Sequence, residues 1–261
     1  MSKIVVLGAG ISGHTAAAHL RRKLPKEHEV LVVSPNRNYQ WVPSNIWVGI
    51  GRMKSKEVIF PLEPLYKRKG IGYKQAKAVS FHPEGDSLEA KPYILVEGVF
   101  GDNLGKQEKV TYDYLINATG PKLAFDMTEG LLPATNKVYS VCTYDHAEHA
   151  SDALHKLIDQ LKKSDKKAKI LIGTGHAKAT CQGAAFEYIL NVEKELQKFG
   201  VRDKAEITWI SNEYELGDFG MDGMLMEYNG FNMKSKDMVE MIFEDRGIKW
   251  ILGAGVTKVE D

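Results

Sequence analysis

Short apolar runs alternate with glycine turns and amphipathic stretches along this chain. Residues 4–7 form an apolar run with the length of a buried parallel strand. After a glycine turn, alanine and leucine recur at helical spacing over residues 14–23. Residues 29–33 form the next apolar run, so the N-terminal segment predicts a strand–helix–strand unit. A second such unit begins at residue 169, with a helix expected at 184–199.

Further elements are expected around these two units. The expected strands lie at 71–81, 93–112 (with turns), 114–118, 169–172, 207–210 and 248–252. Residues 146–163 predict an amphipathic helix, because Ala150, Leu154, Ile158 and Leu161 fall on one face together with Leu157. Residues 34–50 are rich in proline and aromatic residues, and we expect no regular element there.

The order of these elements predicts an α/β protein with two Rossmann-like dinucleotide-binding domains. We expect the first domain, with an antiparallel excursion, at residues 1–125. The second is expected at residues 137–261. Because the chain stops soon after a strand and a turn, we also expect the C-terminal part of the fold to be missing from it.

Composition narrows the function. A net charge of +1 with 43% hydrophobic and 26% charged residues is typical of a globular protein and disfavours nucleic-acid binding. The sequence predicts neither a signal peptide nor a membrane-spanning segment, and two cysteines make no secreted disulfide framework. The eight histidines show no metal-ligand spacing, so no metal site is expected.

The first glycine turn has the spacing of a dinucleotide-binding motif. Gly8 permits a tight turn, Gly10 lets the backbone approach a pyrophosphate, and Gly13 allows close helix–strand packing, with Ser12 beside them. The alternative is a purely structural turn. The acidic residue that normally binds the ribose is replaced by a neutral group. Ser34 and Asn36 are expected there as ribose or adenine contacts, which disfavours NAD and leaves FAD open.

The second glycine motif is broken, and a cysteine lies within the break. Lys178 stands where the third glycine would be, and Cys181 follows in the lengthened turn. With Thr180 as the expected N-cap, the thiol would lie in the first helical turn, where the helix dipole favours thiolate. Glu187 is a candidate proton acceptor near the thiol. An inert buried cysteine and an ordinary surface glutamate remain the alternatives.

Four segments of the sequence resemble sulfide:quinone oxidoreductases, which are FAD-dependent flavoproteins with two dinucleotide-binding domains. They are Tyr39-Gln40-Trp41-Val42-Pro43-Ser44-Asn45-Ile46-Trp47-Val48-Gly49, Ala118-Thr119-Gly120, Val141-Cys142-Thr143 with His146, and the segment from Thr180 to Glu187. The Ala-Thr-Gly segment is generic among such flavoproteins. The combination of the Pro-Ser-Asn loop with both cysteine segments is specific.

The resemblance implies a function and a site. The implied reaction oxidises sulfide to polysulfide or sulfur, with electrons passing through FAD to a membrane quinone. The implied catalytic residues are Cys181, Cys142, Glu187 and His146. The implied FAD contacts, besides the first glycine turn, are Ser34, Asn36, Ser44, Asn45, Ala118, Thr119 and Gly120.

The family also implies features that this chain does not contain. Cys181 would pair through a sulfur bridge with a cysteine further along the complete protein, and C-terminal helices would attach it to a membrane surface as a peripheral protein. A homo-oligomer is left open. The Gly-His-x-Gly segment of some members corresponds here to residues 217–220, where Asp218 replaces the histidine, which suggests a different subgroup.

Two other functions remain in competition. A type II NADH:quinone reductase would keep an intact second glycine motif and an acidic residue directly after the following strand, where this chain has Ser211 and Asn212. A non-catalytic FAD-binding redox sensor would bind flavin without oxidising sulfide. Cys142 as a core residue, His146 as a polar helix start, and Ser44 and Asn45 as turn residues are the corresponding structural alternatives.

Overall fold

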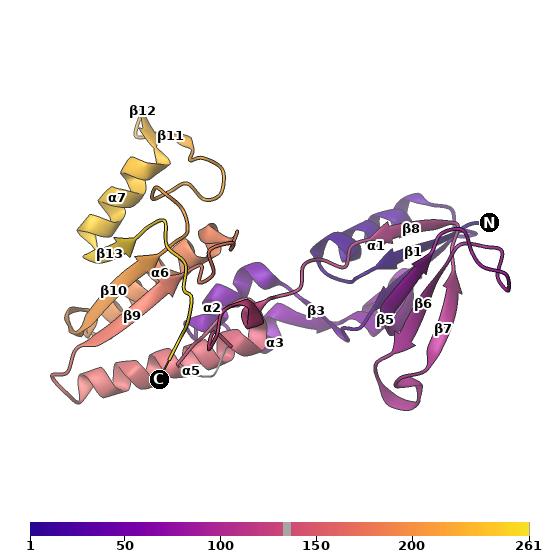
Figure 1. Cartoon of the computed structure of the whole chain (residues 1–261), viewed down its shortest axis with the longest axis horizontal. Coiled ribbons are helices and arrows are strands. Elements are labelled where there is room, and N and C mark those ends of the chain that lie inside the picture. The colour runs from indigo at the N-terminus through magenta and orange to yellow at the C-terminus, as the bar shows by residue number, and fades with distance from the viewer. Residues whose placement is uncertain (133–136, 261) are drawn as a thin grey trace. The chain divides into compact units, whose positions relative to one another are not determined.

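The computed structural model describes residues 1–132 and 137–260, so Asp261, the last residue of the expected second domain, lies outside it. The chain divides into two compact units (Figure 1). Unit 1 comprises residues 1–41 and 59–123, and unit 2 comprises residues 42–58 and 124–261. The sequence analysis placed residues 42–58 in the first domain, whereas in the structure this segment packs with unit 2.

Unit 1 is built on a six-stranded mixed sheet with the strand order β7-β6-β5-β2-β1-β8. Its elements are β1 (Lys3–Leu7), α1 (Ile11–Lys23), β2 (Glu29–Ser34), β3 (Asn38–Gln40), β4 (Ile59–Pro61), α4 (Leu62–Lys69), β5 (Gly72–His82), β6 (Tyr93–Gly98), β7 (Gln107–Thr111) and β8 (Tyr114–Asn117). Strands β5, β2, β1 and β8 are parallel, and β5, β6 and β7 form the expected antiparallel excursion.

The centre of this sheet is apolar on both faces. Val5, Val6 and Val32 are fully buried, as expected for strands that are covered on both sides. Helix α1 begins at Ile11, three residues before its expected start, because the N–H of His14 already donates to the carbonyl of Gly10. The strand–helix–strand prediction for the N-terminus is therefore confirmed.

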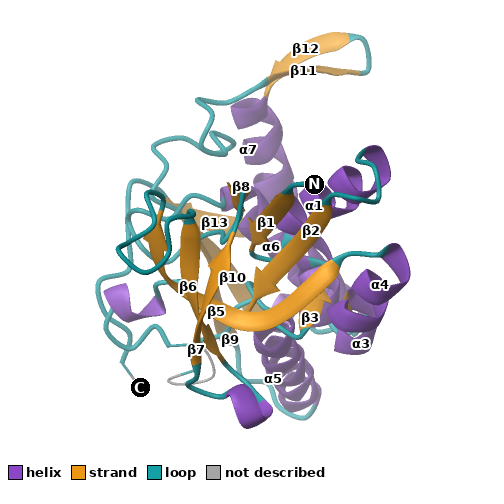
Figure 2. Cartoon of the chain, turned by 90° about the vertical axis from the view of Figure 1, so that its right-hand side faces the viewer, coloured by secondary structure: helices purple, strands orange, loops and turns teal. Residues whose placement is uncertain are grey.

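Unit 2 contains a three-stranded parallel sheet with the order β13-β10-β9 and a separate hairpin that projects beside α7 (Figure 2). Its elements are α2 (Asn45–Gly49), α3 (Ser55–Val58), α5 (Tyr144–Lys162), β9 (Ala168–Gly173), α6 (Gln182–Lys198), β10 (Ala205–Ile210), β11 (Leu225–Tyr228), β12 (Phe231–Lys234), α7 (Ser235–Asp245) and β13 (Ile248–Ile251). Helix α7 and the β11–β12 hairpin were not expected from the sequence.

The core of unit 2 joins its helices to this sheet. Ile158 of α5, Leu196 of α6 and Phe243 of α7 pack in one buried cluster with Ile207 and Trp209 of β10. The expected apolar face of α5 is therefore confirmed. The absence of regular structure expected for residues 34–50 is wrong, because β3, a 3-10 turn at Val42–Ser44 and α2 lie there.

Candidate functional site

The first glycine turn has the geometry that its spacing predicts. A Cβ added to Gly8, whose φ is +92°, would lie 2.2 Å from the carbonyl oxygen of Ala118 in unit 1. A Cβ on Gly13 would lie 2.1 Å from the carbonyl oxygen of Gly8, so neither position accepts a side chain. At Gly10, by contrast, no atom lies within 4 Å of an added Cβ. The first and third glycines are closely packed, and the second faces open space.

These features fit the pyrophosphate of a dinucleotide. Gly10 is the N-cap of α1 and has no side chain to cap the helix, so the positive end of a 13-residue helix faces the same open space. Ser12 is exposed in the first turn of α1. Ala118 forms the floor under Gly8 and Gly13, while Thr119 and Gly120 are exposed beside it. The residues therefore fit FAD, and they would hold its phosphates with backbone N–H groups.

Ser34 and Asn36, at the end of β2, were both expected to contact ribose or adenine, but in the structure they have different roles. Ser34 is 1% exposed, and its Oγ accepts a hydrogen bond from the N–H of Asn36 at 3.2 Å. The serine thus shapes the turn and presents the exposed Asn36 side chain. The hydroxyl of Tyr73, whose pKa burial raises to about 12, donates to the carbonyl of Asn36 at 2.6 Å. The contact of either side chain with a nucleotide stays a prediction.

His14, to which the sequence analysis gave no role, belongs to an aromatic cluster directly behind this turn. Its Nδ1 lies 3.2 Å from the hydroxyl of Tyr66, and its ring lies near those of Tyr39 and Phe60. Burial, with a smaller contribution from the charge of Lys69, lowers the pKa of His14. The cluster fixes α1 against α4, and spatial proximity of this kind leaves no signal in sequence spacing.

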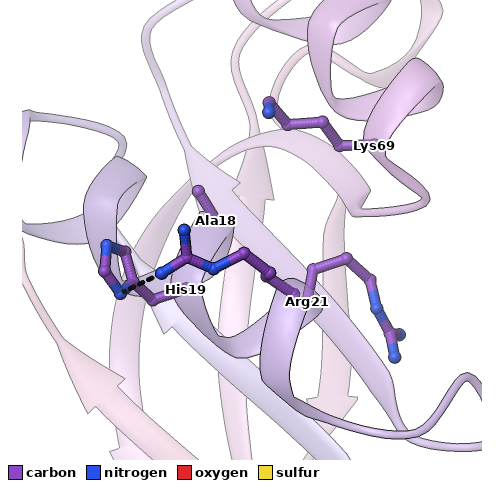
Figure 3. A pocket seen from close by; sticks show the side chains of 5 residues that line it. Ala18, His19, Arg21 and Lys69 are labelled. Atoms are coloured by element: carbon purple, nitrogen blue, oxygen red, sulfur yellow. Dashed lines mark hydrogen bonds between the residues drawn. The ribbon is translucent and has the colours of Figure 1, made fainter.

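A basic hollow lies at the other end of α1 (Figure 3). Its lining comprises Ala18, His19, Arg21, Arg22 and Lys69, and it measures about 360 Å³. The guanidinium of Arg21 donates to three backbone carbonyls that follow the helix, and Arg22 lies 3.4 Å from the ring of His19. Arg21 thus holds the segment that follows α1, a role distinct from that of the glycine turn.

The predicted flavin-side residues Ser44 and Asn45 belong to unit 2. Asn45 is 1% exposed, and its Nδ2 donates to the carbonyl of Val141 at 3.0 Å. This bond ties α2 to the segment that carries Cys142. Ser44 is half-buried and directly precedes α2. A structural role of Asn45 is therefore visible, and contact of both residues with flavin stays a prediction.

Cys142 is an exposed free thiol two residues before α5. Its backbone N–H donates to the Oγ of Ser140 at 3.1 Å. His146, in the first turn of α5, presents its ring to the edge of Phe125 with centroids 5.5 Å apart. The Nδ1 of His146 is buried and has no hydrogen-bond partner within the described chain. Cys142 and His146 thus lie at the same end of α5, and their catalytic roles stay predictions.

Cys181 is also an exposed free thiol, and it occupies the N-cap position of α6. The expectation that Thr180 caps this helix is wrong, because α6 begins at Gln182 and the cap residue is the cysteine itself. No side-chain hydrogen bond caps the helix. Cys181 therefore stands at the positive end of a 17-residue helix with its sulfur exposed.

Glu187 is exposed on α6 beside a shallow hollow that the sequence analysis missed. The hollow measures about 500 Å³, and its lining comprises Gly183, Phe186, Glu187, Leu190, Asn191, Phe219 and Met224. It begins within the first turn of α6, next to the turn that carries Cys181. Phe219 and Met224 follow β10 in a loop without recognisable periodicity, so only the tertiary structure brings them to α6.

The turn between β9 and α6 is tied to the residues that follow β10. A Cβ on Gly173 would lie 1.8 Å from the carbonyl oxygen of Ile210, so this glycine keeps the structural role of the motif. Further along the turn, Asn212 bonds to backbone carbonyls of the turn and to the side chain of Gln182. The second turn is therefore filled by protein groups.

No group of three or more histidine, cysteine, aspartate or glutamate side chains in residues 1–132 and 137–260 is arranged to hold a metal ion. Within the same residues, none of the helices combines the length and hydropathy that a membrane span requires.

Three comparisons with known proteins agree on the group to which the chain is similar. Residues 2–196 match the family model described as pyridine nucleotide-disulphide oxidoreductase. The chain is 30% identical to the sulfide-quinone reductase of Aquifex aeolicus (strain VF5) over 257 residues, which are 98% of this chain and 52% of that protein. It is 28% identical to the type II NADH:quinone oxidoreductase of Haemophilus influenzae over 176 residues, 66% of this chain and 38% of that protein.

The solved structure of the sulfide:quinone oxidoreductase from the hyperthermophilic bacterium Aquifex aeolicus matches with a TM-score of 0.79 and 28% identity. The match covers 100% of this chain and 53% of that chain, so the chain spans about half the length of these relatives. The resemblance stated from the sequence and the α/β fold are confirmed. FAD is confirmed as the cofactor of this group of flavoproteins.

Proposed function

Because the chain belongs to the pyridine nucleotide-disulphide oxidoreductase family, we propose that it is the cofactor- and thiol-bearing part of a sulfide:quinone oxidoreductase. The observation that carries this proposal is the contrast between the two glycine turns. The turn of unit 1 is open at Gly10 and fits a pyrophosphate. The turn of unit 2 is tied by Asn212 and presents Cys181.

In the overall reaction, hydrosulfide, a proton and quinone are converted to zero-valent sulfur and quinol, so that atoms and charge balance. FAD, when bound, supplies the two-electron chemistry that connects sulfur oxidation to quinone reduction. Unit 1 contributes binding: the N–H groups at the start of α1 hold the phosphates, and Gly10 leaves them space. The neutral Ser34–Asn36 turn replaces the acidic residue that would favour NAD.

Unit 2 contributes the sulfur chemistry. In a sulfur bridge between Cys181 and a second cysteine of the complete protein, hydrosulfide would attack the sulfur bonded to Cys181. The S–S bond would then break with Cys181 leaving as thiolate, which the positive end of α6 stabilises. Its exposure gives hydrosulfide access. Cys142 would assist the release of oxidised sulfur, with the neighbouring imidazole of His146 holding the proton. Glu187 would accept a proton beside the hollow on α6.

The similarity to the type II NADH:quinone oxidoreductase of Haemophilus influenzae makes NADH oxidation the second candidate function. Such a reaction needs a dinucleotide site in unit 2. Lys178 replaces the third glycine there, and the carbonyls of Ala177 and Ala179 are turned toward Asn212. Carbonyl oxygens repel a phosphate, which needs N–H donors, so this arrangement supports the sulfide reaction.

The deciding experiment compares two reductants on the full-length protein with FAD bound. Under anaerobic conditions we expect sulfide, and not NADH, to bleach the flavin absorbance, and added quinone to restore it. The Cys181→Ser variant should lose sulfide-dependent bleaching by more than about 1,000-fold, the scale seen when an enzyme loses its nucleophile. The control Thr180→Ala, at the adjacent exposed position, should keep it. Bleaching by NADH alone, or full activity of Cys181→Ser, would refute the proposal.

A further inference from the structure

We propose that Asn212 is the positioning residue of the Cys181 turn. Its side chain holds the turn between β9 and α6 together and thereby sets where Cys181 stands at the start of α6. This inference rests on the proposed function, because it concerns the turn that carries the reacting sulfur. The sequence analysis noted Asn212 only as a residue that is not acidic.

One side chain makes four hydrogen bonds to this turn. The Nδ2 of Asn212 donates to the carbonyl of Ala177 at 2.7 Å and to that of Ala179 at 3.1 Å. Its Oδ1 accepts from the Nε2 of Gln182 at 3.3 Å and from the Oγ1 of Thr174 at 3.4 Å. An amide offers two donors and two acceptor sites, so all of them are directed at the turn.

The orientation of both amides follows from their partners. Backbone carbonyls only accept, so the nitrogen of Asn212 must face Ala177 and Ala179. Its oxygen then faces Gln182, whose nitrogen must donate. Gln182 is 4% exposed and is the first residue of α6, directly after Cys181. A continuous chain of hydrogen bonds thus leads from the end of β10 to the residue that adjoins the thiol.

Other bonds also hold this turn, because the N–H of Thr174 donates to the carbonyl of Ile210, that of Val256 to the carbonyl of Gly175, and the Nε2 of Gln182 to the carbonyl of Ala179. Its own backbone bonds span single tight turns, from the N–H of His176 to the carbonyl of Thr174 and from that of Ala179 to the carbonyl of His176. Neither bond reaches α6. Asn212 is the side chain that joins both ends of the turn, because its partners run from Thr174 to Gln182.

The corresponding turn of unit 1 has no hydrogen-bonding side chain at the position equivalent to Asn212. Ser211 directly follows β10, and its Oγ accepts a hydrogen bond from the N–H of Glu213 at 3.1 Å. In the same way, the Oγ of Ser34 at the end of β2 accepts a hydrogen bond from the N–H of Asn36. Pro35 follows Ser34 where Asn212 follows Ser211. Proline has no side-chain donor, and the first turn stays open at Gly10. Asn212 is therefore one difference between the thiol-bearing turn and the phosphate-binding one, besides Lys178 and the greater length of the second turn.

The test uses Asn212→Ala, Asn212→Asp and the control Asn232→Asp, a change at an exposed position of β12 in the same unit. Aspartate keeps the size and both acceptors but cannot donate to the two carbonyls. Alkylation of Cys181 by neutral iodoacetamide is measured by mass spectrometry at pH 7, with Cys142 of the same molecules as internal reference.

Both variants should lower the ratio of Cys181 to Cys142 alkylation at least about threefold, because only thiolate reacts and a loosened turn loses the placement at the positive end of α6. Alkylation of Cys181 should be slower in Asn212→Asp than in Asn212→Ala, since aspartate adds a negative charge. Hydrogen exchange of residues 176–182 should rise about tenfold or more, with β9 and β10 unchanged. Asn232→Asp should change neither quantity.

An unchanged alkylation ratio in both variants would overturn the inference, even if their melting temperatures fall. In the full-length protein, Asn212→Asp should lower kcat for sulfide while flavin content and the KM for quinone stay the same. A different result would refute the proposed function, namely oxidation of sulfide by Cys181→Ser at the wild-type rate. The alkylation ratio needs no sulfide chemistry, so the two failures are distinguishable.

Discussion

The β1–α1 turn of unit 1 and the β9–α6 turn of unit 2 share a backbone plan and differ in chemistry. In each, the first glycine lies too close to the carbonyl of a neighbouring strand to accept a side chain, as Gly8 and Gly173 show. They diverge at the third position, where the first turn has Gly13 and the second has Lys178. The lengthened second turn makes room for Cys181. The same framework thus offers N–H donors to an anion in one unit and a thiol in the other.

Both helices that follow these turns pack on their sheets through buried apolar residues, and they differ in the other groups that they bury. Helix α1 packs closely on its sheet through Gly13 and Ala17, both buried. Helix α6 instead buries two carboxylates: Glu193 pairs with Arg202 and Arg246, and Glu195 pairs with Arg52. Close packing suits a helix whose N-terminus must approach a ligand.

The largest effect should come from alanine at the third glycine of the first turn. In Gly13→Ala the new Cβ would meet the carbonyl oxygen of Gly8 at 2.1 Å, so the backbone of one of them must move. We expect a loss of more than about 4 kcal/mol in the free energy of unfolding, or no folded protein. At Gly183, in the first turn of α6, an added Cβ meets no atom within 4 Å. Gly183→Ala should therefore raise the free energy of unfolding by about 0.5–1 kcal/mol. Urea unfolding measures both, and equal effects would refute the comparison.

The next effect concerns the buried carboxylate of α6. Glu193 is fully buried, and Glu193→Ala would leave Arg202 and Arg246 without their partner. Breaking such a pair on one side costs about 3–5 kcal/mol, and partial exposure of both arginines places this case near the lower end. The control is Glu206→Ala on β10, an exposed pair with Lys249 that should cost less than about 1 kcal/mol. Similar melting temperatures of the two variants would contradict this account.

The sequence predicted those parts of the molecule that depend on local pattern. Strands β1 and β2 and the apolar face of α5 follow from periodicity, and the first glycine turn follows from spacing. The grouping of segment 42–58 with unit 2 could not be predicted, because it depends on contacts such as Asn45 with Val141, 96 residues apart. No periodicity encodes such a contact. The N-cap position of Cys181 was missed because Thr180 is the better cap by residue type.

A smaller effect should separate binding from folding at the first turn. Gly10 has a φ of −71°, which any residue adopts, and its added Cβ meets no protein atom. Gly10→Ala should therefore fold with wild-type stability. The methyl group would project into the space expected for the pyrophosphate, and we expect FAD affinity to fall at least about tenfold, or 1.4 kcal/mol. Flavin content after purification and titration of the apoprotein measure it. Undiminished affinity would show that the phosphate lies elsewhere.

The smallest effect concerns the residue that follows Asn212. Glu213 of unit 2 occupies the position that neutral Asn36 occupies in unit 1, and it is 6% exposed. Burial raises the pKa of Glu213, and the charge of Asp218 adds to this, against a hydrogen bond from Ser211. The folded state thus binds the proton more tightly than the unfolded chain. Stability must fall as pH rises from the unfolded pKa, about 4.3, through the higher folded value.

Glu213→Gln makes the second turn neutral like the first and should remove this pH dependence. At pH 8 the variant should be more stable than the wild type, because burial penalises the ionised carboxylate of Glu213. Near pH 3, which lies below the unfolded pKa, this gain should vanish, because the wild-type carboxyl is then mostly protonated in both states. Urea unfolding at the two pH values measures it, with Glu215→Gln at an exposed neighbouring position as control. A gain that is the same at both pH values would show that ionisation of Glu213 has no part in it, and that the charge difference between the two turns carries no energetic consequence.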